Sequence, residues 1–185
     1  MTIWTIGHST RAIEEFIELL RTNGIKVVAD VRRFPASRRY PQFNQAELRS
    51  ALSAEGIDYF WLPSLGGRRQ PLPDSPNDAW RNDAFRGYAD HIATEEFASG
   101  LFDLLGVAEG APTAVMCSEA VWWRCHRSII SDVLCSIGID VLHIMDSTTT
   151  TRHPYTSAAR IVDGTLTYAK ENSDDSQQLE ISLLT

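Results

Sequence analysis

The segment MCSEAVWWRCHR combines two thiols, an imidazole, a carboxylate and two guanidinium groups within twelve residues. A cysteine close to a histidine and to cationic side chains ionises more readily, and its thiolate is a strong nucleophile. This pattern predicts that Cys117 is a nucleophile or redox thiol, that His126 is its general base, and that Glu119 is an acid or orienting group. Arg124 and Arg127 are predicted to lower the thiol pKa and to bind an anion.

The same cysteines allow two other interpretations. A cysteine at the end of an apolar run often packs as a small core residue, so Cys117 could be structural. Cys117, Cys125 and His126, together with His143, are also residue types that bind metals. Their spacing lacks the short ligand pair of a structural zinc site, and adjacent residues on a helix point about 100° apart. No metal ligand is therefore predicted, and no cofactor is assigned.

Six residues, two of them tryptophans, separate Cys117 from Arg124. A loop that encircles one phosphate with its backbone amides needs small, tightly wound residues. The two bulky rings therefore disfavour the phosphate-binding loop of the cysteine phosphatases. An anion site at the N-terminus of the following helix remains open.

Arginine carries nearly all of the positive charge, because Lys26 and Lys170 are the only lysines among 17 basic residues. The planar guanidinium group binds phosphate or carboxylate through two hydrogen bonds, although GC-rich coding would also favour arginine. Arginine interleaved with aromatic residues suits nucleotides, since rings stack on bases while guanidinium groups bind phosphates. The alternative is a solvated loop held by ion pairs. The predicted ligand-binding residues are Asp30, Arg32, Arg33, Arg38, Arg68, Arg69, Tyr88, Arg124 and Arg127.

His8 and Asp30 follow two predicted strands. His8 lies in a Gly-His-Ser-Thr turn, where Ser9 or Thr10 is predicted to cap the next helix and His8 is a second candidate base. Alternation along an extended strand aims Asp30 and Arg32 to the same side. Asp30 is therefore predicted to hold an arginine in place for the ligand.

The acidic balance of the chain hides a positive region. The formal net charge is −7, which argues against a general nucleic-acid coat and against a polybasic membrane anchor. Residues 30–88 nevertheless carry nine arginines and only seven acidic residues. A positive region on an acidic protein favours a defined anionic partner, either a small molecule or a nucleic acid.

Short apolar runs alternate with longer segments of helical periodicity, and this alternation is typical of a mostly parallel sheet covered by helices. The runs predict strands at residues 3–6, 25–31, 57–62, 113–117 and 139–145. Helices are predicted from 13 to a stop at 23–24, from an Asn44 cap to Gly56, over 78–107 with a break near Thr94, and over 124–137. Residues 161–169, with Asp163-Gly164 between two short runs, predict a small C-terminal hairpin. The predicted fold is thus α/β, with about five strands.

The polar clusters follow the carboxyl ends of these strands. His8, Arg32, the LGGRR loop, Cys117 and His143 each come at or just after the end of a predicted strand. In open α/β sheets this edge is where ligands bind. The sequence therefore predicts one site, at the carboxyl edge of the sheet.

A chain of 185 residues predicts one domain, here residues 1–170, followed by an acidic, flexible tail at 171–185. No stretch reaches the roughly 18 apolar residues of a membrane span, and no signal-peptide pattern opens the chain. We therefore expect a cytoplasmic protein away from membranes, with its three cysteines as thiols. The oligomeric state is not predicted.

The segments TIGHST, DVRRFPASRRYPQFN, LGGRR, FRGYAD and MCSEAVWWRCHRS, in this order, resemble the family called domain of unknown function 488. The resemblance covers about residues 2–145. It implies a single-domain α/β protein of bacterial or archaeal type, and it implies no settled activity.

Two hypotheses follow. The first is an enzyme that binds a phosphorylated, nucleotide-like or nucleic-acid substrate through its arginines and uses Cys117, with His126 or His8 as base. The second is a non-catalytic module in which the same arginines bind an anion or a nucleic acid while the cysteine only packs. They differ in whether the thiol reacts in the folded protein.

Overall fold

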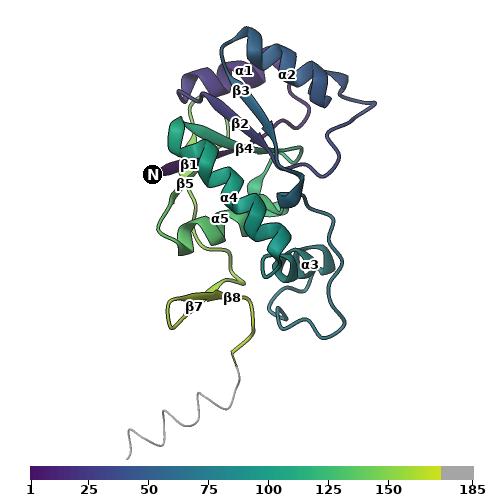
Figure 1. Ribbon diagram of the computed structural model, residues 1–185, viewed down its shortest axis with the longest axis vertical. Helices are drawn as coiled ribbons and strands as arrows, with labels where there is room; N and C mark the ends of the chain where they lie inside the picture. Colours follow the sequence, from purple (N-terminus) through teal and green to yellow (C-terminus); the bar gives the residue numbers. More distant parts are fainter. Residues whose placement is uncertain (172–185) are drawn as a thin grey trace, which may run out of the picture.

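The structure, a computed structural model, describes residues 1–171, in which strands and helices alternate along most of the chain (Figure 1). The strands are β1 (Thr2–Gly7), β2 (Val27–Asp30), β3 (Asp58–Trp61), β4 (Thr113–Cys117), β5 (Asp140–Ile144), β6 (Thr150–Arg152), β7 (Arg160–Val162) and β8 (Thr165–Thr167). The α-helices are α1 (Ile13–Thr22), α2 (Gln45–Ala54), α3 (Asp83–His91), α4 (Glu95–Gly110) and α5 (Arg127–Ser136). Three short 3₁₀ turns are η1 (Pro41–Phe43), η2 (Pro63–Leu65) and η3 (Trp122–Arg124).

Six strands form one sheet in the order β3-β2-β4-β1-β5-β6. The first five run parallel, which confirms the predicted α/β fold. The central strands β2 and β4 are buried along their whole length, as parallel strands covered on both faces must be. Because the strands are parallel, the carboxyl ends of β1, β2 and β4 meet at one edge.

Helices cover both faces of this sheet (Figure 1). Helices α1 and α2 pack on one face, where Phe16 and Leu48 belong to the same apolar cluster as Met116. Helices α3, α4 and α5 contribute to the other cluster, which contains Leu104 and Cys117. Successive residues of a strand point to opposite faces, so Met116 and Cys117 belong to different clusters. The predicted single domain is therefore built as three layers around two apolar clusters.

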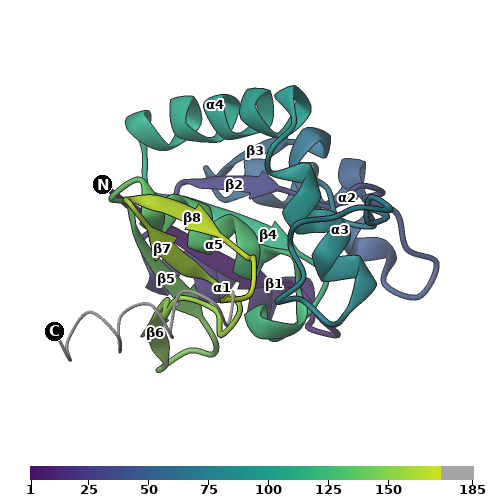
Figure 2. The same cartoon turned by 90° about the horizontal axis from the view of Figure 1, so that it is seen from below.

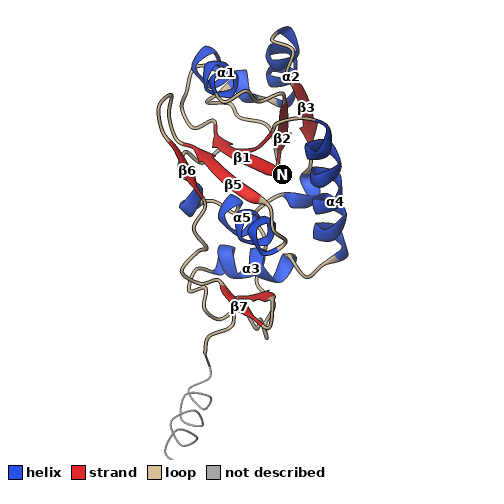
Figure 3. Cartoon of the chain, turned by 90° about the vertical axis from the view of Figure 1, so that its left-hand side faces the viewer, coloured by secondary structure: helices blue, strands red, loops and turns tan. Residues whose placement is uncertain are grey.

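The strands beyond β5 complete the domain. The sequence predicted about five strands, and the structure adds β6, which pairs antiparallel with β5 at the edge of the sheet (Figure 3). The predicted C-terminal hairpin is present as β7 and β8, joined at Asp163-Gly164, and it packs beside α5 (Figure 2). Tyr168 then enters the core. The predicted flexible tail lies outside the described residues from 172 onward.

Several helix boundaries differ from the sequence-based predictions. Thr94 does cap α4, because its side chain accepts from the amide of Phe97. Neither Ser9 nor Thr10 caps α1, whose N-cap residue is Ala12. Asn44 precedes α2, but its side chain accepts a hydrogen bond from the amide of Ser37 at 2.6 Å instead of capping the helix.

Two helices also begin later than predicted. Helix α3 starts at Asp83 rather than at residue 78, because the side chain of Asn82 caps it by accepting from the next amides. Helix α5 starts at Arg127 rather than at residue 124, because η3 precedes it and Cys125 is extended. Cys125 and His126 therefore do not lie on one continuous helix. Within residues 1–171, none of the helices combines the length and the apolar character needed to cross a membrane.

Candidate functional site

A pocket of about 580 Å³ opens at the carboxyl ends of β1, β2 and β4. Each strand delivers a different chemical group: His8 follows β1, Arg32 follows β2, and Cys117 ends β4. The loop after β3 and the segment before α5 close the remaining sides. The predicted site residues that line this pocket are His8, Arg32, Arg33, Arg68, Tyr88, Cys117, Glu119, Arg124 and His126.

Close backbone packing builds the floor of the pocket. The amide of His8 donates to the carbonyl of Cys117 at 3.0 Å, so the pairing of β1 with β4 continues into the site. Gly7 lies directly beneath this loop, since a Cβ there would be 1.8 Å from the carbonyl oxygen of Glu119. A Cβ on Gly67 would lie 2.8 Å from Nδ1 of His126, so Gly67 is constrained less tightly, by a side chain rather than by backbone. Gly7 is therefore the glycine that the close approach requires.

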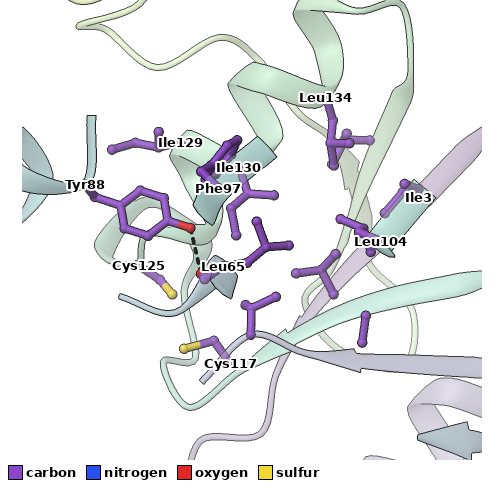
Figure 4. Close-up of a cluster of buried hydrophobic side chains, with 14 of the residues drawn as sticks. Ile3, Leu65, Tyr88, Phe97, Leu104, Cys117, Cys125, Ile129, Ile130 and Leu134 are labelled. Atoms are coloured by element: carbon purple, nitrogen blue, oxygen red, sulfur yellow. Dashed lines mark hydrogen bonds between the residues drawn. The ribbon is translucent and has the colours of Figure 1, made fainter. Parts of the chain in front are cut away.

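Two cysteines and a histidine meet at this floor. The sulfur atoms of Cys117 and Cys125 and a ring nitrogen of His126 all lie within 4.8 Å of one another. Figure 4 shows the two sulfur atoms facing each other below Tyr88. The sequence analysis disfavoured joint metal binding by Cys125 and His126, because adjacent residues on a helix point in different directions. That argument does not apply here, because only His126 directly precedes α5 and Cys125 is extended.

The hydrogen bonds of His126 set its tautomer. Its Nε2 lies 3.1 Å from the carbonyl oxygen of Val31, which can only accept, so Nε2 carries the proton of the neutral ring. Its Nδ1 then presents a lone pair to Cys125 Sγ at 3.6 Å. Burial lowers the pKa of His126 below its usual value and favours the neutral ring. A thiol, an imidazole and a group that orients the imidazole are the parts of an activated nucleophile.

Arg127 separates the two thiols in acidity. Its Nε donates to Cys125 Sγ at 3.4 Å, while its Nη2 donates to the carbonyl of Glu119. Burial alone would raise the pKa of Cys125, but the hydrogen bond with Cys117 and the charge and hydrogen bonding of Arg127 lower it to about 6. The hydrogen bond with Cys125, followed by burial, raises the pKa of Cys117 well above its ordinary value. Cys125 is thus the thiolate at neutral pH.

A second buried group surrounds His8. Arg32 donates from Nε and Nη2 to the carboxylate of Asp30, which forms the predicted Asp–Arg pair, and from Nη1 to the carbonyl of Phe43. The ring of His8 stacks on Phe43 with centroids 4.2 Å apart. Burial, followed by the charge of Arg32, lowers the pKa of His8 to about 4. His8 therefore lines the pocket as a neutral ring whose Nε2 faces Arg32 at 3.4 Å.

The mouth of the pocket is positively charged. Arg33, Arg68 and Arg124 are exposed there, whereas Glu119 is the single carboxylate among its lining residues in the described chain. The guanidinium carbons of Arg33 and Arg68 lie 5.8 and 5.9 Å from the centre of the Phe34 ring, which is 63% exposed. The mouth thus offers guanidinium groups together with a flat apolar ring.

Arg68 also carries backbone strain. It adopts φ of 60°, in the left-handed region that glycine tolerates better. Such a conformation costs about 1 kcal/mol or more and persists only where the surroundings enforce it. The strained backbone belongs to a residue of the pocket mouth.

Four predicted ligand-binding residues do not line the pocket. Asp30 is fully buried under Arg32, and Arg127 is buried behind the thiols. The side chain of Arg69 points away from the pocket and forms a 2.8 Å ion pair with Glu96, a residue of α4. Arg38 is exposed and is not among the lining residues. Asp30 and Arg127 position other side chains.

Histidine 143, considered with the cysteines as a metal ligand, lies elsewhere. Its Nδ1 is 2.7 Å from Oγ1 of Thr5, and its Nε2 is 2.9 Å from Nδ1 of His153. Trp122 stacks on its ring with centroids 4.4 Å apart. Because Trp122 packs there, it does not seal the thiols from the pocket. The tight cluster of thiol and imidazole donors in residues 1–171 consists of Cys117, Cys125 and His126, which are donor types that soft metal ions accept.

The sequence missed the full role of Cys125, which entered only as a metal-ligating type. Cys125 could have been recognised because it directly precedes His126 and lies two residues before Arg127. The helix predicted from residue 124 instead suggested that Cys125 and His126 point in different directions. Phe34 and Gly67 were also missed. Phe34 lay inside the segment DVRRFP, but only the structure shows that its ring is exposed beside two arginines.

The comparisons with known proteins agree with the resemblance seen in the sequence. A family model described as "Domain of unknown function DUF488" matches residues 12–134, which is most of the chain. No curated protein and no solved structure matches the chain. The matched region contains all the strands whose ends form the pocket except β1, together with both cysteines of its floor. The chain therefore belongs to the family of domain of unknown function DUF488.

Proposed function

We propose that this protein is a cysteine-dependent enzyme that acts on a phosphorylated, nucleotide-like or nucleic-acid substrate. The observation that carries the proposal is the meeting of Cys125 and His126 at the floor of a pocket whose mouth carries arginines. Perturbed titratable groups in a concave, charged pocket are what an active site requires.

Cys125 is the nucleophile of this proposal, in the role that the sequence assigned to Cys117. The imidazole Nδ1 of His126 and the guanidinium group of Arg127 both contact its sulfur. The sulfur of Cys117 lies within 4.8 Å of that of Cys125, and its interaction with Cys125 helps to lower the Cys125 pKa, so Cys117 acts as a positioning residue. His126 serves as the base in preference to His8, whose Nε2 already faces Arg32.

The reaction is a group transfer to sulfur. The Cys125 thiolate attacks the phosphorus of the substrate, the S–P bond forms, and the bond from phosphorus to the leaving oxygen breaks. The leaving oxygen takes a proton from solvent water and leaves hydroxide. A second water then attacks the phosphorus while Nδ1 of His126 takes its proton, the S–P bond breaks, and the thiolate is restored. His126 finally gives that proton to the hydroxide.

The substrate class follows from the mouth of the pocket. Arg33, Arg68 and Arg124 are exposed to solvent, and guanidinium groups bind phosphate oxygens in pairs of hydrogen bonds. Within residues 1–171, the Arg33 side chain uses only Nη1, which donates to the carbonyl of Arg68 at 3.3 Å. Phe34 supplies an exposed ring beside two of these arginines, the arrangement that accommodates a base next to its phosphate. A nucleotide is the smallest molecule that uses both features.

Alkylation with iodoacetamide, followed by peptide mass spectrometry, tests the proposal. At pH 7 we expect Cys125 to react at least about tenfold faster than Cys135, although Cys135 is more exposed. Burial raises the pKa of Cys135, so this residue is an internal control. Phosphate or a nucleoside monophosphate should slow Cys125 and leave Cys135 unchanged.

The outcomes separate the two hypotheses. A Cys125 that stays inert until the protein unfolds, with phosphate still bound, would leave only the anion-binding module. A Cys125 that reacts only after treatment with a chelator would show a metal-bound thiol and overturn the nucleophile. For nucleic acid as substrate, affinity must fall as salt rises, and no binding at low salt removes that class.

A further inference from the structure

The second thiol of the pocket floor has no chemical step in the proposed reaction. Cys117 ends β4, and Cys125 follows it after seven intervening residues. Both are free thiols in the structure, and their sulfur atoms lie within 4.8 Å of each other. Figure 4 shows the two side chains converging from different segments. Two facing thiols allow a two-electron step that one thiol cannot complete.

The segment between the cysteines forms neither a strand nor an α-helix. Ser118, Glu119 and Ala120 are exposed, and η3 is a single 3₁₀ turn rather than a stable helix. A disulfide needs the sulfur atoms about 2 Å apart, so a shift of less than 3 Å is required. The strand end holds Cys117, which leaves the extended Cys125 to make that shift.

Both sulfur atoms can be reached by a small oxidant. Cys117 and Cys125 are each more than nine-tenths buried, yet both belong to the lining of the 580 Å³ pocket. Hydrogen peroxide is a small neutral molecule and can enter such a pocket. Cys135, the third thiol, lies on α5 and is not part of the pocket lining.

We infer that Cys117 and Cys125 form a reversible disulfide when hydrogen peroxide enters the pocket, with Cys125 as the attacking thiol and Cys117 as the resolving thiol. The inference shares the Cys125 thiolate with the proposed function but needs no phosphorylated substrate. It assigns a role to Cys117 and a redox-controlled state to the pocket.

The two steps balance. The Cys125 thiolate attacks one oxygen of hydrogen peroxide, the S–O bond forms, the O–O bond breaks, and the leaving hydroxide takes a proton from the solvent to become water. Cys117 then gives its proton to Nδ1 of His126, and its sulfur attacks the sulfenic sulfur of Cys125. The S–S bond forms, the S–O bond breaks, and hydroxide takes the proton from His126. Two thiols are oxidised, and one peroxide is reduced to two waters.

The acidities of the two thiols fit these roles. Arg127 and Cys117 together lower the pKa of Cys125, so it attacks first. The pKa of Cys117 is raised, so it stays protonated until the sulfenic acid removes the neighbouring negative charge. Oxidation of Cys125 would remove the nucleophile of the proposed reaction, and a dithiol reductant would restore it.

The test uses the full chain, first treated with a chelator and dithiothreitol and then freed of both. One equivalent of hydrogen peroxide at pH 7 should lower the intact mass by two hydrogens. Mapping without reduction should join the peptides that carry Cys117 and Cys125. We expect Cys125 to react at least about tenfold faster than Cys135. Dithiothreitol should reverse the change.

Three single variants define the roles. Cys117→Ser should stop at the sulfenic acid, which dimedone traps on Cys125. Cys125→Ser should form no disulfide, and Cys135→Ser, the matched control, should behave as the wild type. A disulfide through Cys135, a link between two chains, or oxidation of Cys125 without resolution in the wild type would overturn the inference.

The two proposals can fail separately. If phosphate protects Cys125 from alkylation but peroxide forms no disulfide, the redox inference fails and the proposed enzyme stands. If the disulfide forms but phosphate and nucleotides neither bind nor protect, the redox pair stands and the proposed enzyme fails.

Discussion

Two clusters of buried polar side chains flank the central strand β1, and they differ in how their hydrogen bonds are used. In the first, Thr5, His143, His153 and Asp132 form a continuous chain, with ring nitrogens bonded on both sides at 2.7–2.9 Å. In the second, the thiols and His126 meet at the floor of a pocket. Both contain histidine, and both contain buried side chains.

The two clusters differ in how completely their polar groups are hydrogen-bonded within the protein. Asp132 accepts from His153, from the amide and hydroxyl of Thr156, and from the hydroxyl of Tyr168, so its cluster is closed on itself. In the pocket cluster, the lone pair of His126 faces a sulfur atom, and the sulfur atoms face open space. Closed networks hold the fold together, whereas a network that ends at a pocket can act on a ligand. A buried histidine alone therefore does not identify a site.

The largest effect is expected when the closed cluster is opened. Asp132→Ala leaves the His153 ring, Thr156 and Tyr168 without their shared acceptor, and removing one member of such a buried group costs about 3–5 kcal/mol. Urea unfolding should show this loss. Asp103→Ala, an exposed carboxylate on α4, is the control and should change the stability by less than about 0.5 kcal/mol.

The same variant tests the separation of the clusters. In the folded fraction of Asp132→Ala, the alkylation rate of Cys125 should equal that of the wild type. If Asp132→Ala left the stability unchanged but slowed the alkylation of Cys125, the roles assigned to the two clusters would be reversed.

The next effect concerns Arg127, which links the pocket cluster to the fold. Its charge and hydrogen bonds lower the pKa of Cys125 to about 6. Arg127→Met should move the midpoint of the alkylation–pH curve from about 6 toward the value of about 8.5 of an ordinary thiol. Arg127→Lys keeps the charge and should move it less. A midpoint that stays near 6 in the methionine variant would exclude Arg127 as the cause.

The sequence predicted the fold better than the chemistry. Apolar runs such as TAVMC and their alternation with helical segments reflect burial, which is a property of each segment taken alone. The edge strand β6 was missed because its three residues are all exposed and carry no apolar pattern. The location of the site followed from topology, since parallel strands bring their carboxyl ends to one edge.

The assignment within the site could not be read from spacing. Which cysteine ionises depends on where Arg127 points, and this depends on the turn η3 that separates Cys125 from helix α5. Likewise, Arg68 and Arg69 are neighbours in sequence, yet one lines the pocket and the other pairs with Glu96. Side-chain direction in loops is set by tertiary contacts that no local pattern reports.

A smaller effect is expected from acid, and it involves one histidine of each region. Burial is the main cause that lowers the pKa of His8 to about 4 and that of His143 to about 3. The folded protein therefore keeps both rings neutral below pH 6.5, while the unfolded chain binds protons there. The free energy of unfolding should be fully present above pH 6.5 and fall by at least about 2 kcal/mol by pH 4.5.

Urea unfolding at several pH values measures this slope. His8→Gln and His143→Gln each remove one titrating ring, so each should flatten the slope between pH 6.5 and 4.5. If only His143→Gln flattens it, the ring of His8 takes up a proton in the folded pocket.

The smallest effect is expected at the mouth of the pocket, where Arg68 acts through its field rather than through a buried contact. The measured quantity is the ratio of the alkylation rate with the anion iodoacetate to the rate with neutral iodoacetamide. In the wild type this ratio should be higher for Cys125 than for Cys135, because cationic clefts concentrate anions. Arg68→Ala should reduce this preference about twofold to fivefold, and added salt should reduce it further. Arg81→Ala, an exposed arginine outside the pocket, should leave it unchanged. If the iodoacetate-to-iodoacetamide rate ratio of Cys125 is the same in Arg68→Ala and Arg81→Ala, the thiolate is influenced only by Arg127 and the buried floor. The arginines of the mouth would then have no part in selecting an anionic substrate.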